Sequence, residues 1–126
     1  AILRASGRLD TTRFGPGYRL YGYKIVNIAL YEPREKNGPE TWRRGIYHQS
    51  ARAVRDSLLG AFDCPESSVR TARRESTTTA LQALALWNGP FVAEQAGLIA
   101  DGLKGAADPV GGAFRQVLGR APDRSE

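Results

Sequence analysis

The sequence predicts a mainly α-helical fold: a small helical bundle with an N-terminal extended arm or short strands, forming a fragment of a larger domain. Three observations lead to this prediction. Apolar residues recur at helical spacing after position 41. Ser, Thr and Asp stand where helices would begin, and glycines stand where they would end. A polar, turn-rich segment at 32–39 separates the expected arm from the helices.

The N-terminal third is expected to be extended after one short helical piece. Ile2 and Leu3 are expected to end a helix that begins upstream, because Ser6-Gly7 follows and glycine commonly closes a helix. Gly15-Pro16-Gly17 is a strong loop signal. Side chains then alternate from Tyr18 to Tyr31, which favours a short strand or an extended arm.

Four helices are expected, near residues 43–60, 77–88, 90–104 and 109–118. The first is predicted from Ile46, Ser50, Val54, Leu58 and Phe62, which recur every four residues. The second has several possible N-caps between Ser76 and Thr79. Pro90 and Pro109 stand in the first turns of the third and fourth, where proline is tolerated.

The expected helix at 77–88 is nearly apolar all round, so we expect it at the centre of the core. This places Leu81, Leu84 and Leu86 away from water. The packing of the other helices and the anion site described below both depend on this burial. The helix at 90–104 is expected to turn Glu94 and Gln95 toward water.

Composition limits the classes of protein that fit. With 126 residues, 41% hydrophobic and 25% charged, the chain is expected to form one soluble unit without a transmembrane segment. The net charge of +5 favours anionic partners. Since no dense Lys/Arg run is present, nucleic acid is not the expected partner. The chain has no methionine, so we expect the natural start upstream.

The single cysteine and the single histidine restrict the cofactor chemistry. Covalent haem c attachment needs Cys-x-x-Cys-His, so we expect no cofactor and no metal site in this segment. His48 is either an axial ligand or general base, or an ordinary residue on a helix, and the second is favoured. Cys64 is either a thiolate activated by arginines or the filler of a small buried gap, and the second is again favoured.

Acidic and arginine side chains around 63–79 suggest two kinds of site. The favoured one is a structural ion pair or arginine-to-carbonyl clamp that fixes the Asp63 turn to the start of the helix at 77–88. Its candidate residues are Asp63, Arg43, Arg44 and Arg74. The other is an anion site at a helix N-terminus. Its candidate residues are Arg73, Arg74, Thr77 and Thr78.

Aromatic residues are concentrated in the first half of the chain and leave a further alternative. They either form a sugar-stacking platform or pack on strands, and packing is favoured. They are Trp42, Tyr18, Tyr21, Tyr23 and Tyr31. A Ser-His-Asp grouping, a glycine-rich phosphate loop and a carboxylate cluster are missing from the sequence, so hydrolase, nucleotide-binding and metal-enzyme classes lack their required parts.

Several segments resemble a known family in order and spacing. They are Tyr31-Glu32-Pro33, Gly38 to Tyr47, Ala61 to Pro65, and Arg73 to Val92, with Ser6 to Asp10 and Leu118 to Pro122 near the ends. Together they resemble the C-terminal part of the planctomycete secreted-protein family called domain of unknown function 1553. The chain departs from the family at Thr79-Ala80, where proline is commoner, and at Trp87, where leucine is commoner.

The resemblance implies a role and a setting. Family members are typically exported, periplasmic or extracellular, and often carry a planctomycete-type cytochrome c domain, so haem c is implied for a missing upstream part. The implied partners are upstream domains of the same polypeptide. We expect a structural or binding module that binds anionic polysaccharide. The alternative is part of an extracytoplasmic haem-linked oxidoreductase that acts on carbohydrates.

Overall fold

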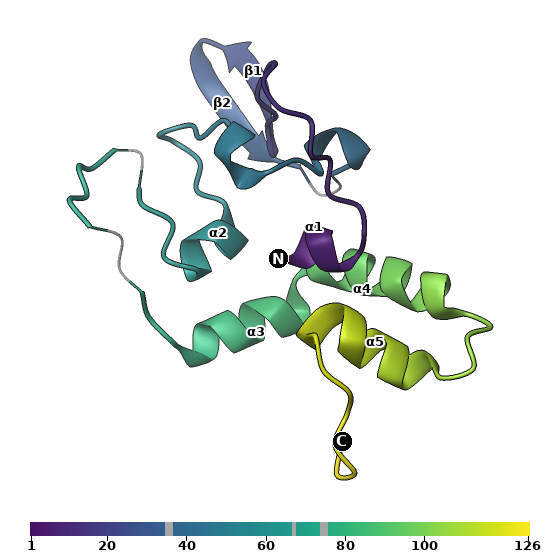
Figure 1. Cartoon of the computed structure of the whole chain (residues 1–126). Helices are drawn as coiled ribbons and strands as arrows, with labels where there is room; N and C mark the ends of the chain where they lie inside the picture. The colour runs from purple at the N-terminus through teal and green to yellow at the C-terminus, as the bar shows by residue number, and fades with distance from the viewer. Residues whose placement is uncertain (35–36, 67, 74–75) are drawn as a thin grey trace. The chain divides into compact units, whose positions relative to one another are not determined.

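The computed structural model describes residues 1–34, 37–66, 68–73 and 76–126, and its fold is mixed α/β rather than the mainly α fold expected (Figure 1). In this part of the chain two strands form an antiparallel sheet, β1 (Tyr21–Val26) and β2 (Ile28–Pro33). Two short 3-10 helices follow, η1 (Pro39–Thr41) and η2 (Gly45–Tyr47). The α-helices are α1 (Ile2–Ala5), α2 (Ser57–Ala61), α3 (Ala80–Asn88), α4 (Pro90–Leu103) and α5 (Pro109–Leu118).

The chain divides into two compact units. One consists of Ala1–Leu9 and Pro90–Glu126, and the other of Asp10–Gly89. In the first unit, α1 packs against α4 and α5. The Gln116 amide donates a hydrogen bond to the carbonyl of Ala5 at 2.7 Å, which ties α5 to the end of α1. The second unit contains the strands, both 3-10 helices, α2 and α3.

Gln95 of α4 is fully buried, so the prediction that it faces water was wrong. The reason is a polar partner on α1's C-terminal side that the helical pattern of α4 does not reveal. The Ser6 hydroxyl donates to Gln95 Oε1 at 2.6 Å. This bond satisfies Oε1 of the buried amide and links the N-terminal residues to α4, whereas Gln95 Nε2 has no hydrogen-bond partner among the described residues.

The helices predicted at 77–88, 90–104 and 109–118 are confirmed as α3, α4 and α5. Their starts follow from local capping. Thr79 and Gln82 form a reciprocal capping box at the start of α3, and Asp108 caps α5. Gly119 closes α5 with φ of 73°, a left-handed conformation that suits glycine. These signals act over three or four residues, so the sequence alone reveals them.

The expectation that α3 is a water-excluded central rod was wrong. Leu81 is 70% exposed, Leu84 54% and Leu86 39%. Within its unit, α3 packs against α2, whose five residues are too few to cover a helix that is apolar on several sides. Within its unit α3 is therefore not the buried centre that was expected.

The long helix expected near 43–60 was also wrong. Residues 45–47 form a single 3-10 turn, and Arg44 and His48 on either side are extended. An α-helix begins only at Ser57, after the Asp56 carboxylate accepts a hydrogen bond from Leu59 N at 2.7 Å. The reason is that the backbone of 42–49 pairs with a distant segment, described below, and this tertiary pairing outweighs the four-residue apolar spacing.

Of the two alternatives expected over Tyr18 to Tyr31, short strands are confirmed as β1 and β2, which form a hairpin rather than one extended arm. Asn27 reverses the chain with φ of 63°, a left-handed conformation that Asn adopts more readily than most residues. Val26 then pairs with Ile28, and Tyr21 with Pro33 at the far end. Because Asn-Ile lacks the usual Asn-Gly signal, the sequence pattern did not indicate this turn.

Apolar side chains remain accessible throughout the described residues, none of which is a buried hydrophobic residue. The accessible area of the chain is 9897 Å². Size scaling gives roughly 6,600 Å² for a folded monomer of this mass. Much apolar surface is therefore available for contact with other molecules. No helix in the described ranges has the length and apolar character needed to cross a membrane.

We expect acid to weaken α5 through its cap. Asp108 accepts from Gly111 N at 2.8 Å and pairs with Arg115 at 3.1 Å, and these contacts lower the pKa of its carboxyl. A lowered pKa in the folded state means that the stabilisation is present above about pH 4 and is lost as pH falls through the lowered pKa. The Gly111 amide shift in an NMR titration measures this directly.

The control for the acid effect is Asp108→Asn. Asparagine also caps helices but does not titrate. Its Gly111 amide shift should therefore stay constant across the same acid range. If the Gly111 amide shift of Asp108→Asn still changes with pH as it does in the unchanged chain, Asp108 is not the group that titrates.

Candidate functional site

Residues 10–18, which we call the arm from here on, run parallel to residues 42–49 and form the base of a pocket. Asp10 N donates to Trp42 O at 2.8 Å, and Tyr18 N donates to Tyr47 O at 2.9 Å. The backbone N–H of Gln49 donates a hydrogen bond to the carbonyl of Tyr18 at 2.8 Å. These bonds explain why residues 42–49 are extended rather than α-helical.

Arg43 fastens the arm to this segment. Its guanidinium donates to the carbonyls of Pro16 at 2.6 Å and Phe14 at 2.7 Å, and more weakly to Thr12 at 3.3 Å. It also lies 4.1 Å from the centre of the Tyr47 ring, a cation–π distance. Its side chain is only 12% exposed. Arg43 is thus an arginine-to-carbonyl clamp on the arm.

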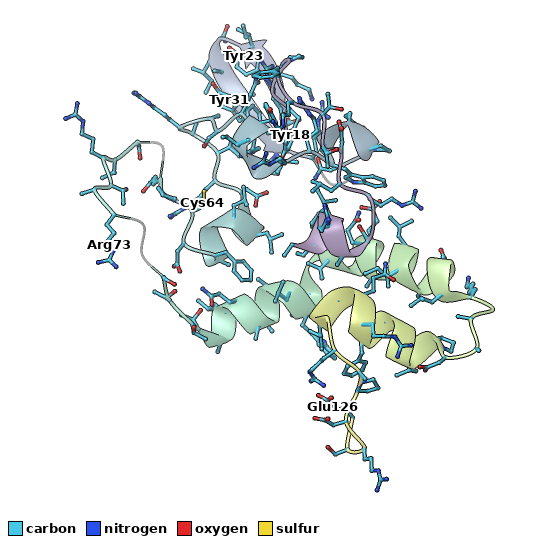
Figure 2. The ribbon with its side chains drawn as sticks, viewed as in Figure 1. Tyr18, Tyr23, Tyr31, Cys64, Arg73 and Glu126 are labelled. Atoms are coloured by element: carbon cyan, nitrogen blue, oxygen red, sulfur yellow. The ribbon has the colours of Figure 1, made fainter. Side chains whose placement is uncertain are left out.

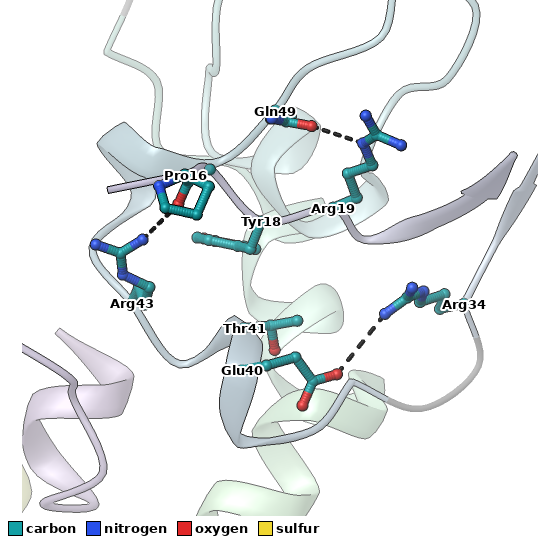
Figure 3. Close-up of a pocket in the computed structure, with 9 residues that line it drawn as sticks. Pro16, Tyr18, Arg19, Arg34, Glu40, Thr41, Arg43 and Gln49 are labelled. Atoms are coloured by element: carbon teal, nitrogen blue, oxygen red, sulfur yellow. Dashed lines mark hydrogen bonds and ion pairs between the residues drawn. The ribbon is translucent and has the colours of Figure 1, made fainter. Parts of the chain in front are cut away.

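A pocket of about 520 Å³ opens between the arm, the base of the hairpin and η1 (Figure 3). This volume falls within the range of about 300–1,000 Å³ for small-ligand sites. Figure 3 shows the Tyr18 ring with Arg43 on one side and Arg19 and Arg34 on the other. The lining residues are Pro16, Gly17, Tyr18, Arg19, Arg34, Glu40, Thr41, Arg43 and Gln49.

Two arginines at the rim make partial contacts that leave donors available. Arg19 Nε donates to Gln49 Oε1 at 2.6 Å, which orients the guanidinium across the rim. Arg34 Nη1 lies 3.7 Å from Glu40 Oε1, and both side chains are well exposed, at 45% and 63%. A long, solvated ion pair of this kind is weak. With three arginines and one glutamate, the lining carries a formal charge of +2.

Tyr18 gives the pocket an aromatic wall. Its ring lies 5.6 Å from the His48 ring in a tilted arrangement. Burial raises the pKa of the Tyr18 hydroxyl, and the negative charge of Asp56 raises it further. The hydroxyl therefore stays protonated near neutral pH and can donate to a ligand. Chemically, the pocket combines planar cationic donors with an apolar ring.

The predicted anion residues lie elsewhere. Arg73 and Thr78 are exposed, Arg73 on the loop between α2 and α3 (Figure 2), and Arg74 lies outside the described residues. The Thr77 amide and hydroxyl donate to the Asp63 carboxylate at 2.7 to 3.0 Å, so an internal acceptor occupies them. The burial of α3 on which this site depended is absent. Anion binding there stays a prediction.

The Asp63 turn contacts the residues that precede α3, and the described contact runs directly through Thr77. Asp63 adopts a left-handed φ of 57°, and its carboxylate binds the backbone and hydroxyl of Thr77. Gln82 then donates to the Thr77 carbonyl at 3.0 Å. Arg43 pairs with Asp10 at 3.7 Å, and Arg44 is exposed. A role of Arg74 at Asp63 stays a prediction, because Arg74 is outside the described residues.

The remaining candidates also have definite places. His48 lies in an extended segment against Tyr18 rather than on the expected helix. Cys64 is half-buried after α2, where its backbone N–H donates to Leu59 O. Tyr21, Tyr23 and Tyr31 pack together on the hairpin, the strand packing that was favoured.

Sequence reasoning missed Arg19, Arg34 and Glu40 as site residues. Arg19 and Arg34 flank the two ends of the apolar stretch 20–33. A hairpin within that stretch brings its ends together, and Arg34 N indeed donates to Leu20 O at 3.0 Å. Recognition of the turn at Asn27 would therefore have placed both arginines beside each other.

Comparison with known families gives a match over the whole chain. The family model described as PSD1, protein of unknown function (DUF1553), matches residues 1–126. The chain belongs to the PSD1 family. This confirms the resemblance found in the sequence. Searches of curated proteins and of solved structures gave no match. The PSD1 description states no activity, so a function for the arginine-lined pocket has to be argued from its chemistry.

Proposed function

We propose that the chain is a binding module of an exported multidomain protein and that its arginine-lined pocket binds an acidic polysaccharide. The single observation that supports this most is the placement of Arg19, Arg34 and Arg43 around one aromatic wall. Guanidinium groups present paired, coplanar donors that match the two oxygens of a carboxylate or sulfate. The Tyr18 ring offers an apolar face and a hydroxyl donor to a sugar.

The charges of the pocket support an anionic ligand over a neutral one. Glu40 offsets only one of the three arginines. Because its ion pair with Arg34 is long and solvated, a ligand carboxylate can replace Glu40 as the partner of Arg34 with little loss. Arg43 is already bonded to backbone carbonyls, so it contributes positive potential and shapes the wall rather than donating freely.

The module is proposed to contact other domains of the same polypeptide through apolar surface. Apolar side chains remain exposed on several sides of α3: Leu81, Leu84, Leu86 and Trp87, the last of which is 87% exposed. Exposed apolar surface of this kind commonly marks contact sites. The haem-linked oxidoreductase alternative stays a prediction, tested by the redox response of a haem-bearing full-length protein to sugar.

We expect Arg34→Ala to weaken binding to an acidic oligosaccharide such as oligogalacturonate by roughly tenfold, the effect of losing one charge-assisted hydrogen bond. Calorimetric titration of the chain at low and high salt measures this. Binding by the unchanged chain should weaken with salt, because exposed charges are screened. A neutral oligosaccharide of equal length should bind far less.

Two single-arginine variants make the test specific. Arg52→Ala removes the same charge from an exposed position outside the pocket and should leave the affinity within about twofold, since a distant exposed charge is screened. Arg73→Ala tests the site predicted at the start of α3. If only Arg73→Ala loses affinity, the ligand binds at the start of α3 and not in the pocket. Equal loss in all three variants, or no binding to any acidic glycan, would refute the pocket as a glycan site.

A further inference from the structure

The outer half of the β1–β2 hairpin is apolar on both of its faces. Ile25 is 73% exposed, Val26 60% and Ile28 68%. Successive side chains on a strand point to opposite faces, so Ile25, paired with Ala29, lies on one face. Val26 and Ile28, which pair with each other, lie on the other. Only Asn27 at the turn is polar in this tip, defined here as residues 25–29.

This two-sided pattern distinguishes possible partners. A sheet that packs on a protein surface buries one face and leaves a polar face in water. A tip with apolar side chains on both faces is better matched by an apolar medium that contacts both faces at once. The apolar layer of a lipid bilayer is such a medium, and partial insertion of apolar groups to about 5–10 Å is the usual depth for interfacial segments. At about 3.3 Å per residue, this depth covers two to three residues of each strand, which is the length of the tip.

Tyrosines follow directly behind the tip. Tyr23 and Tyr31 face each other across the strands (Figure 2), with ring centres 5.2 Å apart. The ring centre of Tyr21 lies 5.5 Å from that of Tyr31. They share the face of Ile25, since Tyr23 pairs with Tyr31 two positions along. Tyrosine combines an apolar ring with a polar hydroxyl and is enriched where hydrocarbon meets headgroups. The hairpin therefore changes from apolar to amphipathic along its length.

Positive charge lies at the base of the hairpin. Lys24 and Glu32 neutralise each other at 3.1 Å, so the middle of the hairpin has little net charge. Arg19 and Arg34 flank the strands, and the whole chain carries +5. The base lies about 20 Å from the turn for six-residue strands. With the tip inserted by about 5–10 Å, these arginines stand roughly 10–15 Å from the membrane surface, which is one to two Debye lengths at physiological salt, and anionic lipids are the complementary partner.

We propose that residues 25–29 insert into the headgroup region of an anionic lipid bilayer, with the tyrosines at the interface and the basic hairpin base facing the lipid phosphates. The inserted tip is separate from the pocket, whereas Arg19 and Arg34 at the hairpin base also line the pocket.

Vesicle co-sedimentation of the whole chain tests the proposal. The chain should sediment with vesicles that contain phosphatidylglycerol and much less with vesicles of phosphatidylcholine alone. The double variant Ile25→Ser/Ile28→Ser should lose at least about tenfold in apparent affinity, because two inserted apolar side chains are removed. The matched control Val110→Ser/Val117→Ser changes two exposed apolar residues on α5 and should bind as the unchanged chain does.

A third variant tests the tip without altering its apolar residues. Asn27→Asp retains a residue type that tolerates the left-handed conformation and adds one negative charge at the turn. Its binding to phosphatidylglycerol vesicles should fall severalfold, whereas circular dichroism should match that of the unchanged chain. Undiminished binding by Asn27→Asp would show that the tip does not approach the anionic surface.

Other outcomes also overturn the proposal. Equal losses in the hairpin and α5 double variants would mean that any apolar surface suffices. The unchanged chain could instead fail to bind vesicles and form oligomers, measured by light scattering. If Ile25→Ser/Ile28→Ser converts those oligomers to monomers, the tip is a contact between copies of the chain. Glycan titration of the same variants separates this result from failure of the pocket, because the hairpin-tip changes should leave glycan affinity intact.

Discussion

Replacement of Arg43 by alanine is expected to lower the free energy of unfolding of the unit Asp10–Gly89 by about 3 kcal/mol. The two short bonds from its guanidinium to Pro16 O and Phe14 O contribute most of this. A hydrogen bond to a charged group contributes roughly 1.5–3 kcal/mol, and we take the lower value for each because the acceptors are exposed. Since whole domains are stable by only about 5–15 kcal/mol, the loss is large.

Urea denaturation followed by fluorescence of Trp42, the neighbour of Arg43, measures this loss. Arg43→Lys keeps the charge but not the forked donors, so it should lose more than half as much stability as Arg43→Ala. Arg44→Ala is the matched control, because Arg44 is adjacent and exposed. If Arg43→Ala and Arg44→Ala unfold at the same urea concentration, Arg43 does not hold the arm.

Gly17→Ala is expected to destabilise the same unit by about 1–3 kcal/mol, the usual effect of forcing extra volume into a filled space. A Cβ at Gly17 would lie 2.7 Å from Tyr47 O and 2.8 Å from Gln49 Cγ. The Tyr47 carbonyl cannot simply move away, because it accepts the hydrogen bond from Tyr18 N. The substitution should therefore separate the arm from residues 47–49 and distort the pocket.

Gly45→Ala is the control for this effect. A Cβ at Gly45 would meet no atom within 4 Å, so the same chemical change should cost little. Both variants should be compared by urea denaturation and by oligogalacturonate titration. If Gly17→Ala retains the stability and affinity of Gly45→Ala, the close approach at Gly17 is not important for the pocket.

Elements determined by neighbouring residues could be predicted from the sequence. Thr79 and Asp108 cap α3 and α5 within three residues, and Gly119 ends α5, so these helices were found with their ends nearly correct. The capping interactions need no knowledge of distant residues. The family could also be recognised, because its segments recur in a specific order.

Elements determined by distant residues could not be predicted. Residues 42–49 had a helical apolar spacing, but their backbone groups pair with the arm thirty residues earlier. Gln95 looked like a surface residue until Ser6 supplied a partner from the other end of the chain. The pocket combines the arm, the hairpin ends and η1, which have no common motif. Arg73 and Thr77 were chosen from local helix-start chemistry, and Asp63 occupies the Thr77 donors instead.

The position of the hairpin between the arm and its pairing segment has a consequence for the order of folding. Tyr18 and His48 must meet across thirty residues, and closing a chain segment loses more entropy as the segment lengthens. A hairpin forms within about 1–10 μs and places Leu20 beside Arg34. The remaining span is then about half as long. We therefore expect the hairpin to close first and the pairing of Tyr18 with His48 to follow, because the closed hairpin shortens the segment that this pairing must close.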